Sequence, residues 1–176
     1  MKNLDIKLIL FDAYGTLFEF EGDQFRGAIA QILDDQRIDF DYEKFYKIWV
    51  DKYSESGVWG LSGPNKEDPY PSTVLNGSLP EWHSQWEIWR RQFEKAFFHY
   101  HLIGDSVSAA NTVRELIAEA DLYTDVRETL SLLSKIKIDL GLLSNADNDF
   151  LNASLSKAGL LFDIVESSES LRIYKP

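Results

Sequence analysis

The sequence predicts an α/β protein in which a parallel sheet is interrupted by a long helical insertion. Apolar runs end abruptly at Asp12 and again at Ser144, as in buried strands of a parallel sheet. Between these points, apolar residues recur at helical spacing through most of the chain. A direct connection between neighbouring parallel strands needs far fewer residues. The intervening helices are therefore predicted to form an insertion.

Composition limits the class of protein and its partners. A hydrophobic fraction of 44% with 14% aromatic residues is typical of a globular chain. The net charge of −11 argues against nucleic acid or an anionic membrane as a main partner. It leaves room for a small anionic substrate, which a few local donors can bind. The absence of cysteine excludes disulfides and thiolate metal sites, and it fits a reducing cytoplasm.

The first strand is predicted over residues 8–11 and, being apolar throughout, is expected to be buried on both faces. A buried strand rarely tolerates a carboxylate, so Asp12 should lie at its carboxyl end, where ligands bind in open α/β sheets. Gly15 permits a sharp turn, and Thr16 offers a hydroxyl beside the acid. This arrangement suits a nucleophilic site. The alternative is an aspartate that merely ends a strand at a turn.

Four helices are predicted before the sheet resumes, each from an apolar stripe. They cover residues 19–37, 39–53, 78–100 and 107–120. In the third, Ser78 and Glu81 have the form of a capping box, and an aromatic stripe starts at Trp82. Residues 55–77, rich in glycine and proline, are either a lid or a passive loop.

The sheet is predicted to resume after residue 123. The remaining elements are a helix over 126–134, a strand over 138–143, a helix over 146–159 and a strand over 162–165. The second strand runs into Ser144 and Asn145, so these residues should lie near Asp12 if the two strands are neighbours. Lys175 then closes the chain, followed only by proline.

The segment Phe11-Asp12-Ala13-Tyr14-Gly15-Thr16-Leu17-Phe18 resembles the first motif of the haloacid dehalogenase-like (HAD) hydrolase superfamily. Ser144-Asn145 and Lys175-Pro176 resemble its second and third motifs, in the right order. The resemblance implies a Rossmann-like α/β core formed by residues 1–21 and 122–176, with a helical cap from residues 22–121 inserted over the active site.

One further segment, Gly104-Asp105-Ser106, mimics the acidic fourth motif of that family. It follows a predicted helix instead of a buried strand, and it precedes the second motif. We interpret it as the start of the next helix, with a capping side chain. The fourth motif is thus not in this chain.

The resemblance also implies roles. Asp12 would attack carbon or phosphorus and form a covalent ester or acyl-phosphate. Lys175 would pair with Asp12 and damp the charge at the reacting centre. Substrate binding would fall to Tyr14, Thr16, Ser144 and Asn145.

Two features leave the reaction open between phosphate-ester and 2-haloacid cleavage. Tyr14 stands where most HAD phosphatases have a second aspartate as general acid, and this resembles the 2-haloacid dehalogenases, whose halide leaves without a proton. Those dehalogenases, however, place an arginine directly after a tryptophan on the first cap helix, whereas Trp49 is followed here by Val50. Lys47 is a poor substitute, because a lysine lacks the planar fork of arginine.

The implied cofactor depends on this choice. A phosphatase would use Mg²⁺, held by Asp12 and the Tyr14 carbonyl, and a dehalogenase would use none. With those two ligands alone the ion would be badly under-coordinated. A different class of function is a non-catalytic relative that binds a partner through its tryptophan-rich cap.

The family's sheet order places the first strand in the middle, whereas this chain has candidates only for the first three strands. The first strand would then be an unpaired apolar edge, which invites pairing with another chain. We expect that the natural protein is longer, or that a second chain, such as another copy in a homo-oligomer, covers this edge.

Overall fold

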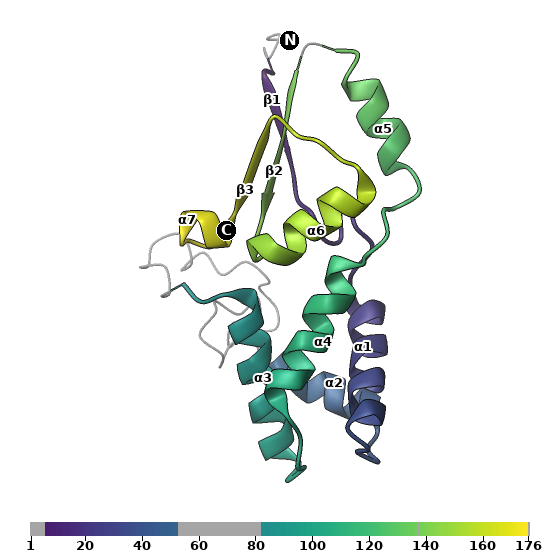
Figure 1. Cartoon of the computed structure of the whole chain (residues 1–176), viewed down its shortest axis with the longest axis vertical. Coiled ribbons are helices and arrows are strands. Elements are labelled where there is room, and N and C mark those ends of the chain that lie inside the picture. The colour runs from purple at the N-terminus through teal and green to yellow at the C-terminus, as the bar shows by residue number, and fades with distance from the viewer. Residues whose placement is uncertain (1–5, 53–81, 137, 176) are drawn as a thin grey trace, which may run out of the picture.

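Three parallel strands form one sheet in the order β1-β2-β3 (Figure 1). They are β1 Leu8–Phe11, β2 Asp139–Ser144 and β3 Ile164–Ser167. The computed structural model describes residues 6–52, 82–136 and 138–175. Phe11 pairs with Leu142, which pairs in turn with Val165. The predicted fold class, an α/β chain with a parallel sheet and a helical insert, is confirmed.

The helices lie in two places. Between β1 and β2 come α1 Gly22–Asp35, α2 Tyr42–Asp51, α3 Gln85–His99, α4 Ser106–Ala118 and α5 Val126–Leu133, while α6 Asn148–Ala158 joins β2 to β3 and α7 Ser168–Leu171 follows β3. Helices α1–α4 pack together as a helical insert at one end of the sheet (Figure 1). Within the described ranges, no helix is long and apolar enough to cross a membrane.

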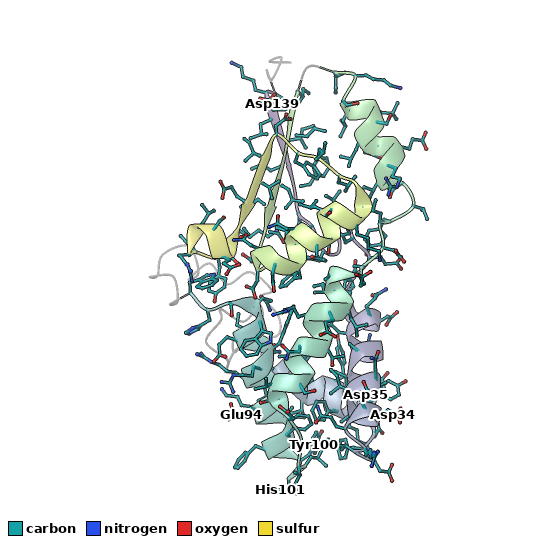
Figure 2. The ribbon with its side chains drawn as sticks, viewed as in Figure 1. Asp34, Asp35, Glu94, Tyr100, His101 and Asp139 are labelled. Atoms are coloured by element: carbon teal, nitrogen blue, oxygen red, sulfur yellow. The ribbon has the colours of Figure 1, made fainter. Side chains whose placement is uncertain are left out.

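The carboxyl ends of the strands face the insert. Asp139, at the start of β2, lies at one end of the molecule, and Tyr100 and His101 lie at the other (Figure 2). The strands run from the Asp139 end toward α3 and α4 (Figure 1). The loops that follow them therefore lie at the junction of sheet and insert.

The aromatic stripes of α2 and α3 form the interior of the insert. The ring of Phe45 contacts that of Phe97 at 5.1 Å between centroids, and Trp49 contacts Phe93 at 5.5 Å. Trp49 and Trp89 are both buried. These rings serve packing, as such stripes usually do.

The prediction that β1 is buried on both faces is wrong. Leu8 is 37% exposed and Leu10 is 52% exposed, while Ile9 and Phe11 are partly buried. Neighbouring side chains of a strand point to opposite faces, and among the described residues one face of β1 is left uncovered. As predicted, β1 is an edge of the described sheet. That another chain pairs with it stays a prediction.

Two predicted helix starts have different outcomes. Asp105 caps α4 by accepting from the amides of Val107 and Ser108 at 2.9 and 3.0 Å, which confirms that this segment starts a helix. Helix α3, in contrast, begins at Gln85, after Ser84, so Trp82 precedes it instead of starting its stripe. The capping box predicted at Ser78 and the segment predicted over residues 55–77 lie outside the described residues.

Candidate active site

Asp12 lies at the carboxyl end of β1, at the edge of the sheet that faces the insert. Asp12 follows the strand directly, and one of its carboxylate oxygens accepts from the Ala13 amide at 2.8 Å. The Ala13 carbonyl accepts from three successive amides, those of residues 16–18, so the chain turns tightly here. Gly15 takes φ +78°, a left-handed conformation that side chains other than glycine disfavour. The glycine of the motif is thus explained by the turn.

Lys175 reaches Asp12 from the other end of the chain. Its ammonium forms an ion pair with Asp12 Oδ1 and donates to the Leu143 carbonyl at 3.1 Å. The side chains of Lys175 and Asp12 are 24% and 39% exposed, so the pair is partly buried and partly accessible to solvent. A small substrate in solution can therefore reach the carboxylate.

Asn145 holds the backbone on which Lys175 sits. Its side-chain oxygen accepts from the Lys175 amide at 2.8 Å, and its side-chain nitrogen donates to the Lys175 carbonyl at 3.3 Å. The structure thus brings together Asp12, Asn145 and Lys175 from three separate segments. The contact of Asn145 with Lys175 is the one visible here, and its predicted contact with substrate stays a prediction.

Tyr14 is held on the side of α6. Its hydroxyl lies 2.9 Å from the Ser154 hydroxyl and 3.3 Å from the Phe150 carbonyl, and its ring packs on Phe18 and Phe150. Burial raises the pKa of the Tyr14 hydroxyl above that of a free tyrosine. A phenol held in this way is a poor proton donor for a leaving group. Its predicted role in substrate binding stays a prediction.

The two remaining predicted site residues lie at the same edge, and no side-chain hydrogen bond joins them to the pair among the described residues. Thr16 is exposed and Ser144, at the end of β2, is buried at 4% exposure. Across the described ranges, no hydrogen bond joins either hydroxyl to Asp12 or Lys175. Their assignment to substrate binding stays a prediction.

The oxygen ligands available at this site do not by themselves fit Mg²⁺. The ion requires near-octahedral oxygen coordination. Of the two predicted ligands, Asp12 already engages Lys175, and the other is the single carbonyl of Tyr14. In the part of the chain that the structure describes, no group of three or more histidines, aspartates or glutamates could hold a metal.

The structure shows the residue after Trp49, where the dehalogenases are expected to carry an arginine, and two arginines of α3. Val50 is 42% exposed beside the buried Trp49 on α2. On α3, Arg90 and Arg91 both bond the Glu87 carboxylate, each with its Nε at 2.7 Å. The hydrogen bond from Arg90 contributes most to lowering the pKa of Glu87 to about 2. These two arginines are thus engaged with a carboxylate of their own helix.

Sequence reasoning missed Asp147. Its side chain is buried, and its two oxygens accept from the amides of Gln85 and Trp86 at 2.7 and 2.9 Å, at the first turn of α3. Burial raises the pKa of Asp147 to about 6, although these two hydrogen bonds act in the opposite direction. In the sequence it lies within a predicted helix. No local sequence pattern indicates that its carboxylate binds the first-turn amides of another helix, α3.

Comparisons with known proteins point to one family. The profile of the haloacid dehalogenase-like hydrolases matches residues 6–176. A curated relative, (S)-2-haloacid dehalogenase 4A of Burkholderia cepacia, is 24% identical over 173 residues, which are 97% of this chain and 64% of the relative. The chain thus spans just under two thirds of that relative's length.

Two solved structures show the same fold. L-2-haloacid dehalogenase from Xanthobacter autotrophicus, with chloropropionic acid covalently bound, superposes with a TM-score of 0.63 at 22% identity, covering 97% of this chain and 60% of that one. A magnesium-bound HAD-hydrolase from Bacillus subtilis superposes with a TM-score of 0.67 at 16% identity, covering 97% and 67%. At these identities the likeness establishes the fold alone.

Proposed function

The chain belongs to the haloacid dehalogenase-like hydrolase family, and on this premise we propose that it hydrolyses a small anionic substrate with Asp12 as covalent nucleophile. The observation that carries the proposal is the contact of Lys175 with Asp12 at the carboxyl end of β1. A carboxylate that is partly exposed and held by a cation and an amide is positioned to attack. The helical insert, with proposed bounds 22–121, acts as the cap over this edge.

A 2-haloacid is the substrate class that we favour. An Asp12 oxygen attacks the carbon that bears the halogen, and the halide leaves with the bonding electron pair. Water then attacks the carbonyl carbon of the resulting ester, releasing a 2-hydroxy acid and a proton and restoring Asp12. No acid is needed for the halide, which agrees with the raised pKa of the Tyr14 hydroxyl. The covalent complex of the Xanthobacter enzyme is consistent with this route.

Phosphoryl transfer is the second candidate. The exposed Val50, where dehalogenases carry an arginine, favours it. Asp12 would attack phosphorus and form an acyl-phosphate that water hydrolyses. The alcohol leaving group of an ester would need a proton that Tyr14 is poorly suited to give. A leaving group that needs little protonation, such as that of acetyl phosphate, fits better.

Turnover with and without a chelator separates these candidates. We expect the chain to release halide from 2-chloropropionate at an unchanged rate in EDTA, because the route uses no metal. Hydrolysis of acetyl phosphate that appears only with added Mg²⁺ would favour the phosphatase instead. A folded protein that includes the acidic fourth motif and is inert toward both would support the third candidate, a partner-binding relative. The burial of Trp49 and Trp89 already argues against that candidate.

A further inference from the structure

The start of α3 is attached to two loops of the sheet part. The Tyr174 hydroxyl accepts from the His83 amide at 2.7 Å and donates to the His83 carbonyl at 3.0 Å. The Asp147 carboxylate accepts from the amides of Gln85 and Trp86. Figure 1 shows α3 beginning beside α7 and the end of the chain. Two buried side chains thus bind four backbone groups of the segment 83–86.

The position of Asp147 in its own helix makes this attachment specific. Asp147 is the residue that precedes α6, yet it makes no side-chain cap there. The Asn148 amide at that helix start is bound instead by the Glu169 carboxylate at 2.6 Å. The carboxylate of Asp147 is therefore committed to α3, where both of its oxygens are used.

The same loops carry the reacting pair. Tyr174 immediately precedes Lys175, whose ammonium contacts Asp12. Asp147 lies two residues after Asn145, whose side chain bonds both backbone groups of Lys175. A displacement of the α3 start would pull on the backbone segments that place the ammonium.

We propose that Asp147 and Tyr174 are positioning residues. Their hydrogen bonds to residues 83–86, which we call the latch, fix the start of α3 to the loops of Asn145 and Lys175. The latch thereby holds the Lys175 ammonium beside Asp12 when the insert is packed on the sheet. The inference rests on the proposed function where it names the reacting pair. The latch itself is observable without a substrate.

The latch is expected to depend on pH. Asp147 is faced by the carboxylates of Asp149 and Glu169, the α3 amides of Gln85 and Trp86, and the Tyr174 hydroxyl. Its pKa is about 6 when latched, and a released, hydrated carboxyl would return toward 3.8. The latched state therefore binds the proton more tightly, and lowering the pH through 6 favours it by up to about 100-fold. At neutral pH burial of the charge weakens the latch, which makes release easier.

Amide hydrogen exchange tests the latch. Protection factors of Gln85 and Trp86, corrected for the intrinsic effect of pH on exchange, should rise as the pH falls from 7 to 5. In Asp147→Asn this dependence should vanish, because an amide does not titrate. The control Asp125→Asn alters an exposed aspartate that makes no side-chain cap, and it should keep the wild-type pH dependence.

A second variant keeps the test decisive if Asp147→Asn fails to fold. Tyr174→Phe removes only the hydroxyl, and it should lower protection of the His83 amide about tenfold while the amides of β2 keep theirs. The proposal is overturned if wild-type protection at Gln85 and Trp86 does not change between pH 7 and 5, or if Asp147→Asn shows the same change. Unchanged protection of His83 in Tyr174→Phe would also overturn it. None of these readouts uses turnover, so failure of the latch and failure of the proposed reaction are distinguishable.

Discussion

Asp12→Asn is expected to reduce turnover of any substrate that the wild-type chain hydrolyses by at least about 10⁴-fold, because a neutral amide oxygen is a far weaker nucleophile. The amide oxygen can still accept from the Ala13 amide, so the local turn should persist. Steady-state kinetics with the favoured 2-haloacid measure the effect. The intact mass of the variant must also show that the asparagine has not deamidated to aspartate.

A matched variant separates loss of the nucleophile from loss of structure. Asp163→Asn replaces an exposed aspartate whose carboxylate, like that of Asp12, accepts from a backbone amide, that of Leu140 at 2.9 Å. It lies at the opposite end of β2 from the site, and its turnover should stay close to wild type. Wild-type turnover in Asp12→Asn would contradict the mechanism. Equal losses in both variants would mean that the chemistry does not depend on Asp12 in particular.

Lys175→Met is expected to lower kcat by about 10²- to 10³-fold, the effect of removing one preorganised charge from a reacting centre. Methionine keeps the length of the side chain but loses the ion pair with Asp12 and the hydrogen bond to the Leu143 carbonyl. The pair is partly exposed, so the free energy of unfolding should change by only about 1 kcal/mol or less. Kinetics together with urea unfolding show the two effects separately.

The control for this variant is Lys44→Met. Lys44 also pairs with an aspartate, the N-cap residue Asp41 of its own helix, and its side chain is 69% exposed. Its loss should leave kcat unchanged. A Lys175→Met enzyme with wild-type kcat would remove Lys175 from the mechanism. A large loss of stability with normal kcat would assign it a structural role instead.

The parts of the fold that the sequence predicted are those that local patterns determine. The strand end at Asp12 and the cap at Asp105 each follow from a few neighbouring residues, and both are found in place. The two strands β1 and β2 are parallel neighbours, so Ser144 at the end of β2 lies at the same edge of the sheet as Asp12. The contact of Asp12 with Lys175 needed the family resemblance, since no local pattern joins residues at opposite ends of a chain.

The features that the sequence did not predict have a common physical cause: each depends on contacts between segments that are distant in the sequence. An apolar strand indicates two covered faces, yet Leu10 is half exposed because no described element covers its face. The start of α3 is set by Ser84 and by Asp147, a residue far away in sequence. The raised pKa of Asp147 results from burial by several segments.

The most direct test of Asp12 as a covalent nucleophile is a single turnover of 2-chloropropionate by excess wild-type chain in water enriched in oxygen-18, followed by peptide mass spectrometry. We expect the heavy oxygen to enter the Asp12 carboxylate, while the product hydroxyl carries the unlabelled oxygen that Asp12 donated, because water attacks the ester carbonyl. Heavy oxygen in the product hydroxyl of that first turnover, with Asp12 unlabelled, would mean that water attacks the substrate directly and that Asp12 is not the nucleophile.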